Sequence, residues 1–335
     1  MLTAPSVPAS SRVNTLGRLI AITALILAAS SGGYAQSPNY SYLYRVKINN
    51  FFSEVGPSPY NSPTQGDRYF TSCGFENLTF TMDASNVGQF NDGQLRWDAF
   101  GGNPARTFNW NDLVPADLSA SGNNSPWDPD RGDTGTPYPN EPGYARLSDI
   151  FTTGNINRIL DGEHNIASAY LDLYFGGGKF VQSDGDSGTP ELVLLERGGN
   201  SGVYIRAIRS DGTYSNTLSV NIRSGTGTTY DPRTNSYIAN IGGSCGFSLD
   251  STEISGAQPV YGTGIDLMAF GNVSTSDRII GYQIWFEVNN TFCNGPDLHG
   301  FILSKQAAVP EAPSIVGLAA MLSSASLWLR RRRRS

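Results

Sequence analysis

The sequence predicts an all-β protein: an antiparallel β-sandwich or jelly-roll-like body, with an N-terminal signal helix before it and a C-terminal membrane helix after it. Two observations point to this fold class. Short segments rich in aromatic and β-branched residues recur along the 335-residue chain, as is typical of half-buried strands. No convincing long amphipathic helix comes between them, which argues against a doubly wound α/β fold.

The expected strands lie where aromatic and β-branched residues recur with a period of two. The first, at 42–49, alternates such residues with mostly basic ones. Further strands are expected at 77–82, 170–175, 191–196, 203–209, 217–223, 265–270, 279–288 and 301–304. Turns are expected at Asp92-Gly93, Asp161-Gly162, Asp184-Gly185 and Asp211-Gly212. The best position for a short helix is 149–160.

One segment interrupts the pattern. Residues 109–143 are crowded with Pro, Gly, Asn and Asp and show almost no apolar periodicity. They could be a linker between two domains or a long surface loop of one sandwich. We favour the loop, because residues 36–108 contain few strands and would make a thin core alone.

The first 35 residues have the features of an export signal. Arg12 and Arg18 are the only charges there, and an apolar stretch of 11 residues follows them at 19–29. That stretch is too short to span a bilayer of about 30 Å. Small residues come next, so a signal peptide over 1–35 with cleavage after Ala35 is predicted. The body is then assigned to 36–307.

The last residues, 308–335, have three consecutive parts. A proline-containing motif comes first, an uncharged apolar run at 315–329 follows, and a cluster of arginines ends the chain. The run predicts a short transmembrane helix, whose basic flank stays on the cytoplasmic side. The residues of the motif are Val309, Pro310, Glu311, Ala312 and Pro313, and those of the cluster are Arg330, Arg331, Arg332, Arg333 and Arg334.

This tail resembles the PEP-CTERM signal of bacterial surface proteins that an exosortase processes. It departs from the family motif at Ala312, where the second proline is expected; that proline comes one residue later. Residues 190–201 resemble the "ELxxLERGxNS" segment of similar exported proteins. The resemblance implies that a membrane sorting protease removes the tail. It implies no catalytic chemistry.

Charge divides sharply between the body and its ends. Residues 36–309 hold 16 basic and 28 acidic side chains, a formal charge of −12. Such a body repels nucleic-acid phosphates and anionic lipid headgroups, so nucleic acid is not expected as a partner. The three cysteines, Cys73, Cys245 and Cys293, allow one internal disulfide at most, and the sequence does not choose among the three pairings.

Catalytic motifs are scarce. The two histidines, His164 and His299, are expected in solvated loops. Residues 242–246 match the pattern GxSxG, but no helical period follows, as a nucleophile elbow requires. Glu191 and Glu196 flank a strongly apolar strand and are five residues apart, so they face opposite sides of it. No cofactor is expected, and the chain is not expected to be an enzyme.

Calcium is the most plausible bound ion, because hard cations take several oxygen ligands from closely spaced acidic residues on loops. The sequence offers two such groups, and neither fits the EF-hand pattern. The candidate ligands are Asp128, Asp130 and Asp133 in one loop, and Asp184 and Asp186 in another.

Exposed aromatic rings could stack on sugars. The rings considered for this role are Trp97, Trp110, Trp127, Tyr138 and Tyr144. The leading expectation is a non-catalytic exported protein, membrane-anchored as a precursor and then placed at the cell surface or in the extracellular matrix. Two alternatives remain: a carbohydrate-binding or adhesive module, with or without calcium, and a secreted glycan-degrading enzyme.

Overall fold

The computed structural model describes residues 36–49, 52–54, 67–76, 78, 81–83, 87–88, 90–115, 126–130, 144–152, 155–156, 158–162, 166–186, 188–249, 257–293, 295–303 and 309–310. Residues Ser37–Ser335 belong to one compact unit, and Met1–Gln36 belong to another. The signal segment through Ala35 and the tail from Glu311 onward, with the predicted membrane helix, lie outside the described residues. Within the described ranges, none of the helices has the length and apolar character needed to cross a bilayer.

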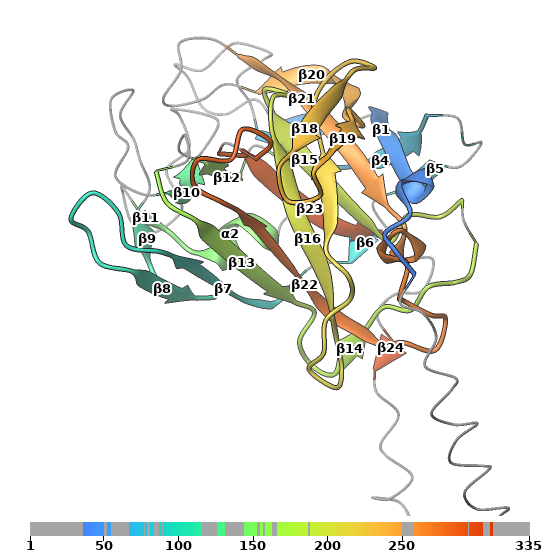
Figure 1. Cartoon of the computed structure of the whole chain (residues 1–335), viewed down its shortest axis with the longest axis horizontal. Helices are drawn as coiled ribbons and strands as arrows, with labels where there is room; N and C mark the ends of the chain where they lie inside the picture. Colours follow the sequence, from blue (N-terminus) through green and yellow to red (C-terminus); the bar gives the residue numbers. More distant parts are fainter. Residues whose placement is uncertain are drawn as a thin grey trace, which may run out of the picture. The chain divides into compact units, whose positions relative to one another are not determined.

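Two large antiparallel sheets dominate the described part of the chain (Figure 1). The larger has the strand order β10-β12-β23-β15-β21-β1-β4-β5, with β20 paired to β21 and β6 to β23. Its strands are β1 Leu43–Asn49, β4 Ser72–Phe75, β5 Thr81–Asp83, β6 Val87–Gly88, β10 Trp127–Asp130, β12 Ile159–Gly162, β15 Leu192–Arg197, β20 Gly243–Leu249, β21 Gln258–Ile265 and β23 Leu298–Leu303.

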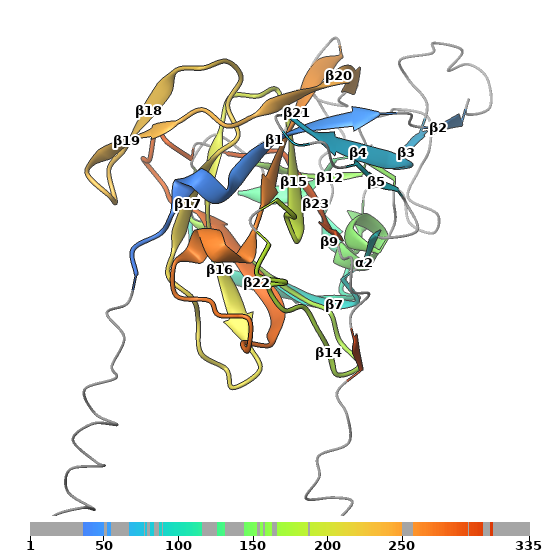
Figure 2. The same cartoon turned by 90° about the vertical axis from the view of Figure 1, so that its right-hand side faces the viewer.

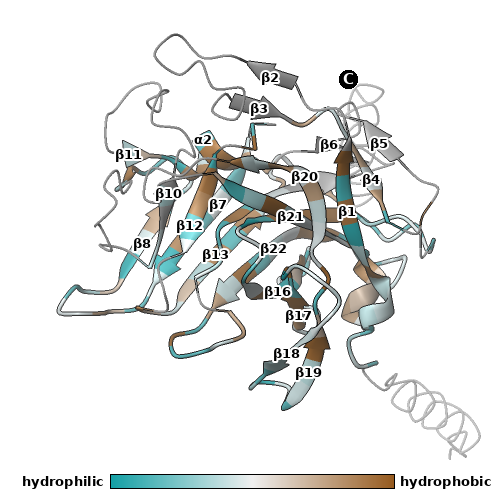
Figure 3. Cartoon of the chain, turned by 90° about the horizontal axis from the view of Figure 1, so that it is seen from above, coloured by the Kyte–Doolittle hydropathy of each residue, from teal (hydrophilic) through white to brown (hydrophobic). Residues whose placement is uncertain are grey.

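The smaller of the two has the strand order β17-β16-β22-β13-β7-β8, which can be followed across Figure 3. Figure 2 shows the two sheets as separate layers, with β7, β16 and β22 on one side and β1, β15 and β21 on the other. This arrangement is a β-sandwich. Its six strands are β7 Asp92–Trp97, β8 Arg106–Asn109, β13 Ala169–Tyr174, β16 Gly202–Arg209, β17 Leu218–Asn221 and β22 Ile279–Phe286.

The main core lies between these layers. Leu95, Leu171 and Ile284 come from the six-stranded sheet, and Leu160 and Leu194 come from the larger one; all are at most 2% exposed. Alternate residues of each strand supply these side chains, because successive residues point to opposite faces. Figure 3 shows this alternation of hydrophobic and hydrophilic residues along β1.

A second, smaller core lies where β20 crosses β1. A Cβ added at Gly243 would meet the Val46 carbonyl oxygen at 2.6 Å, so only glycine allows the two backbones to approach this closely. Cys73, Phe75 and Cys245 are buried in this core together with Val46. The tetrapeptide Ser-Cys-Gly-Phe occurs twice, at 72–75 and 244–247, and it lies in two strands, β4 and β20, that share this core.

Short elements complete the fold. Among the described residues, paired two- to four-residue strands form four small sheets, and the helices are three to five residues long. The bounds of these strands are β2 Phe52–Glu54 with β3 Asp67–Tyr69, β9 Val114–Pro115 with β11 Tyr144–Ala145, β14 Lys179–Phe180 with β24 Val309–Pro310, and β18 Thr228–Asp231 with β19 Ser236–Ala239. The described helices are η1 Tyr40–Tyr42, α2 Leu147–Phe151 and η3 Leu267–Phe270.

The last described residues are part of this structure. Val309 pairs with Phe180 and Pro310 pairs with Lys179, so the first two positions of the predicted sorting motif form the strand β24 (Figure 1). The other three motif residues lie outside the described residues.

Several sequence predictions need correction. Residues 267–270, expected in a strand, form η3, because the Asp266 side chain accepts a hydrogen bond from Met268 N and begins a 3-10 turn. The expected helix at 149–160 is only the five-residue α2, followed by β12. Asp92-Gly93 and Asp161-Gly162 lie within strands rather than in turns. The segment 109–143 includes the short strands β9 and β10, so it is not all loop.

Candidate functional site

The six-stranded sheet turns one face to the core and the other away from it; we call the second the outer face. The pairing register of the strands determines which residues lie on the outer face. Tyr204 pairs with Trp285, Trp285 with Tyr170, and Tyr170 with Arg96, so these residues form one row across four strands. The next row on the same face contains Arg206, Gln283, Asp172, Gln94 and Asn109.

Hydrogen bonds connect the side chains of this second row. Arg206 Nε donates to Gln283 Oε1 at 2.9 Å, and Gln283 Nε2 donates to Asp172 Oδ1 at 2.6 Å. Arg96 Nη2 reaches the other Asp172 oxygen at 3.2 Å. Gln283 and Asp172 are only 4% and 8% exposed, although they point away from the core. These hydrogen bonds hold the side chains of the row in place, so the row is a rigid polar surface, which we call the polar floor.

Guanidinium groups stack on the aromatic rings beside this floor. The Arg206 guanidinium carbon lies 3.6 Å from the centre of the Tyr214 ring and 5.6 Å from that of Trp285. Arg233 covers the other side, at 5.3 Å from Trp285 and 4.7 Å from Tyr204. These cation–π contacts hold both guanidinium groups in place. Arg206 Nε donates to Gln283, and Arg233 Nη1 lies 3.4 Å from Glu287. Tyr214 itself stays 39% exposed.

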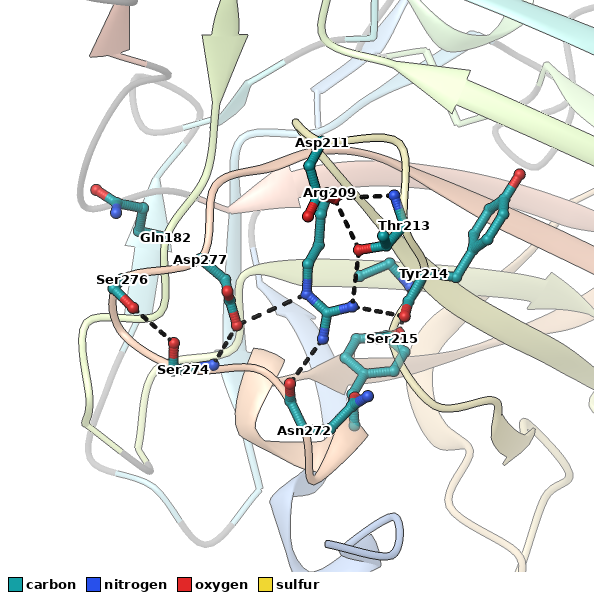
Figure 4. Close-up of polar contacts among 12 residues, drawn as sticks. Gln182, Arg209, Asp211, Thr213, Tyr214, Ser215, Asn272, Ser274, Ser276 and Asp277 are labelled. Atoms are coloured by element: carbon teal, nitrogen blue, oxygen red, sulfur yellow. Dashed lines mark hydrogen bonds and ion pairs between the residues drawn. The ribbon is translucent and has the colours of Figure 1, made fainter. Parts of the chain in front are cut away.

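A polar cluster at the end of β16 positions Tyr214 (Figure 4). Arg209 Nη1 donates to the Tyr214 carbonyl at 2.5 Å, and Arg209 Nη2 donates to the Asn272 carbonyl at 2.7 Å. Asp277 lies 3.7 Å from Arg209 Nε. One side chain thus connects the 210–215 turn to the 271–278 loop, which fixes the ring that covers Arg206.

Hydrogen bonds within the 210–215 turn also stabilise it. Asp211 Oδ1 accepts hydrogen bonds from Thr213 Oγ1 at 2.7 Å and from Thr213 N at 2.9 Å (Figure 4). These bonds favour the carboxylate and lower the pKa of Asp211 below its ordinary value. Gly212 supplies the positive φ, 82°, that the turn requires.

The β18–β19 hairpin borders the outer face through one buried carboxylate. Asp231 is 0% exposed and accepts hydrogen bonds from Tyr204 Oη at 2.8 Å, Ser219 Oγ at 2.5 Å and Arg233 N at 2.9 Å. Tyr230 and Tyr237 alternate with the buried residues of the hairpin and stay 40% and 69% exposed. The hairpin therefore holds Arg233 over Trp285 and presents two rings to solvent.

A separate charged network lies inside the larger sheet. Arg197 is 2% exposed; its Nη2 is 2.8 Å from Asp161 Oδ2, and its Nε is 3.2 Å from Asp297 Oδ2. The neighbouring Glu196 accepts hydrogen bonds from the backbone N–H groups of Gly199 and Asn200. Burial raises the pKa of Glu196 well above its usual range, and these hydrogen bonds oppose the shift. Residues 195–201 (LERGGNS) thus form the buried end of strand β15 and the turn that follows it.

Comparison with known proteins finds no relative for this chain. No protein-family model, no curated protein and no solved structure matches it. The PEP-CTERM resemblance of the tail therefore stays a prediction, and the function must be argued from the site itself.

Most of the aromatic residues first considered for sugar binding are buried. Trp97, Trp110 and Trp127 are 4%, 7% and 0% exposed, and Trp127 Nε1 donates to two backbone carbonyls. Tyr144 is 44% exposed, and Tyr138 lies outside the described residues. Sequence reasoning missed the outer face. The alternation at 169–174 and 279–286 could have indicated it. That pattern was used to place the strands, but not to decide which aromatic side chains point away from the core.

The histidines and the GxSxG pattern form no catalytic group in the described residues. His299 is 1% exposed rather than solvated, and its Nδ1 lies 2.7 Å from the Arg158 carbonyl. His164 lies outside the described residues. Residues 242–246 run into β20, so a strand follows Ser244 where an elbow needs a helix.

The predicted calcium ligands have different positions. Asp128 and Asp130 lie on β10, paired with β12, and Asp133 lies outside the described residues. Asp184 and Asp186 are exposed on one loop, where Asp184 Oδ1 accepts from Asp186 N at 2.8 Å. In the described ranges, no three His, Cys, Asp or Glu side chains already converge as a metal-binding group.

Proposed function

We propose that this chain is an exported, non-catalytic protein of the cell surface or extracellular matrix, released by a membrane sorting protease. The order of segments along the chain carries the proposal: a signal-like start, an all-β acidic body, and an apolar run between a proline-containing motif and five arginines. The β-sandwich supports it, because such a body needs neither cofactor nor partner chain to present a surface.

Mass spectrometry of the mature protein tests the proposed processing and location. In a host that has the sorting protease, we expect a chain that starts near Gln36 and ends close to the 309–313 motif. In a host without the protease, the arginine cluster is retained and the chain stays with the membrane. An intact precursor dissolved in the cytosol would refute the proposal.

We further propose that the outer face binds a neutral extracellular polysaccharide. The supporting observation is the exposed Tyr214 ring held against the Arg206 guanidinium, with the buried Trp285 beneath that guanidinium. Sugar rings stack their apolar faces on aromatic rings, while fixed N–H donors can bind their hydroxyls. The formal charge of −12 on residues 36–309 favours a neutral chain over an anionic one.

Affinity electrophoresis in gels containing neutral or anionic polysaccharides tests this binding. Tyr214→Ala and Tyr170→Ala are expected to weaken retardation by a neutral polysaccharide about tenfold each, equivalent to about 1.4 kcal/mol. Tyr144→Ala is the matched control, because Tyr144 is similarly exposed but lies on β11, outside the six-stranded sheet. Equal effects of all three substitutions, or no retardation of the unmodified protein, would contradict the proposal.

A further inference from the structure

Two carboxyl groups face each other inside the sandwich. Leu192 of β15 pairs with Ile265 of β21, so the next residues outward, Glu191 and Asp266, are opposite each other at the strand ends. The exposed fractions of Glu191 and Asp266 are 5% and 0%. Like charges in directly opposite positions are unfavourable, and burial increases the cost. The pair therefore requires a compensating group.

The two carboxyls are incompletely hydrogen-bonded. Glu191 Oε2 accepts from Leu267 N at 2.8 Å, and Asp266 Oδ1 accepts from Met268 N at 2.8 Å. The Asp184 backbone N–H makes a weaker contact with the Glu191 carboxyl. No well-formed hydrogen bond reaches Glu191 Oε1 or Asp266 Oδ2 from the described residues. Native proteins rarely leave such atoms buried without a partner, which indicates an occupant.

A third buried polar group, the Tyr282 hydroxyl, interacts with the Glu191–Asp266 pair. Tyr282 is 0% exposed, and its hydroxyl has no hydrogen-bond partner in the described part of the chain. Burial raises the pKa of Tyr282, and the charges of Glu191 and Asp266 raise it further, so the three groups interact electrostatically. The ring otherwise packs among the aromatic side chains of Phe90, Phe175 and Phe270.

The loop beside the pair adds more negative charge. Asp184 and Asp186 are exposed on it, and both charges act on Asp266. Burial raises the pKa of Asp266 to about 7, and these neighbours contribute to the shift. This pair differs from the Asp161–Arg197–Asp297 network, where a guanidinium lies between the carboxylates.

We propose that Glu191 and Asp266, together with Asp184 and Asp186 of the adjacent loop, bind a calcium ion. The donors are all oxygens, which suits Ca²⁺ rather than zinc. The cation would replace the missing partner of the two buried carboxyls. Because the loop carboxylates do not converge on the pair in the present structure, binding requires Asp184 and Asp186 to turn toward the pair.

The first experiment titrates the whole secreted chain with Ca²⁺ alone by calorimetry and by thermal unfolding, with EDTA and Mg²⁺ as comparisons. We expect Ca²⁺ to raise the unfolding temperature more than Mg²⁺ does, since Mg²⁺ demands stricter octahedral geometry. An unfolding temperature and heat signal that do not respond to millimolar Ca²⁺ would overturn the proposal.

Variants then locate the ion. Asp184→Asn is expected to weaken Ca²⁺ binding about tenfold, and it changes an exposed residue that does not endanger folding. Asp211→Asn is the matched control, an exposed aspartate that likewise accepts from the backbone N–H two residues on. Equal losses in the two variants would overturn the proposal.

Substitution of the buried pair gives an independent result. Glu191→Gln with Asp266→Asn should abolish the response to Ca²⁺ and raise the unfolding temperature in EDTA, because the like charges are gone. If the double variant still responds to Ca²⁺, the ion binds elsewhere and the proposal fails. If Ca²⁺ has no effect on the unmodified chain and stability in EDTA simply falls above neutral pH, the pair shares a proton instead.

Discussion

At the residue scale, Arg197 shows most clearly how the fold tolerates buried charge. Its guanidinium bridges Asp161 of β12 and Asp297, two residues far apart in the sequence. Burial raises the pKa of Asp297, and the Arg197 charge opposes that shift. Removing the cation would leave two buried carboxyls uncompensated.

We therefore predict that Arg197→Met lowers the free energy of unfolding by about 3–5 kcal/mol, as measured by urea denaturation. The control is Arg233→Met, whose ion pair with Glu287 at 3.4 Å is partly exposed, with side chains 39% and 34% accessible. Loss of that pair should cost about 1 kcal/mol or less. Equal costs for the two substitutions would show that the Arg197 network contributes little.

His299 makes the stability of the fold sensitive to acid. Burial lowers the pKa of His299 to about 4 from its ordinary 6.5, and the Arg158 carbonyl only partly opposes this shift. The unfolded chain binds the proton more readily than the folded one below pH 6.5, so this residue costs stability as the pH falls from 6.5 to 4.

The corresponding prediction uses His299→Gln. The stability of the variant should fall less steeply than that of the unmodified protein between pH 6.5 and 4, as measured by denaturant unfolding at each pH. Asp266 acts in the opposite direction, because its raised pKa of about 7 makes the chain more stable as the pH falls. The comparison is therefore made in Ca²⁺ and again in EDTA. Parallel pH curves for the two proteins would show that His299 does not titrate as described.

At the element scale, the β18–β19 hairpin depends on a single side chain. Asp231 satisfies donors from two strands of the six-stranded sheet and from its own turn. Asp231→Ala should open the hairpin locally, at a cost of about 1–3 kcal/mol for the hydroxyls left buried. Amide hydrogen exchange of β18 and β19 is expected to accelerate, whereas that of β13 and β22 stays slow. Unchanged exchange in the hairpin would contradict this prediction.

The two cores of the sandwich also favour one of the three cysteine pairings. Cys73 and Cys245 belong to the smaller core, whereas Cys293 belongs to the larger one. Cys73 pairs in register with Ile48, whose backbone N–H donates to the Cys245 sulfur, and the Cys73 thiol acts on the pKa of Cys245. An intramolecular disulfide, if one forms, should therefore link Cys73 and Cys245.

Peptide mapping without reduction tests this pairing in the exported protein. An oxidised dithiol protein of the export pathway would accept the two electrons and two protons that the thiols release. The linked peptides are expected to contain Cys73 and Cys245, while Cys293 is alkylated only after unfolding. Any linked peptide that contains Cys293 would contradict the assignment.

The same elements show what sequence patterns determine. Strands with strong alternation were placed nearly correctly: 203–209 became Gly202–Arg209, and 170–175 became Ala169–Tyr174. The segment 265–270 was misassigned because an apolar run has no period, and one side-chain cap at Asp266 decides its conformation. Asp161-Gly162 was misread as a turn because the sequence does not reveal that Arg197 would compensate a carboxylate within a strand.

The candidate sites were harder to predict than the strands. Residue types suggested aromatic rings and acidic loops, but strand register decides which of them meet. The outer face joins residues from β7, β13, β22 and β16, and Glu191 meets Asp266 across more than seventy residues of sequence. Such pairings depend on long-range contacts that local patterns do not contain.

At the scale of the whole molecule, the proposed extracellular location agrees with the charge and chemistry of the protein surface. A body with formal charge −12 and a cross-sheet polar floor suits an aqueous, polysaccharide-containing environment, in which we expect it to be displayed. The apolar segments at the two ends serve transport in the proposed function, and the sandwich remains after processing.

The pairing of β24 with β14 would affect the timing of the proposed maturation. Proteases generally take substrates as extended chains, and Val309 and Pro310 already use their extended backbone against Phe180 and Lys179. A bound protease and the folded edge would therefore compete for the same short peptide. Tail removal should be faster from a body that has not finished folding, and a Phe180→Pro substitution, which prevents the pairing, should shorten the lifetime of the precursor in a pulse-chase measurement.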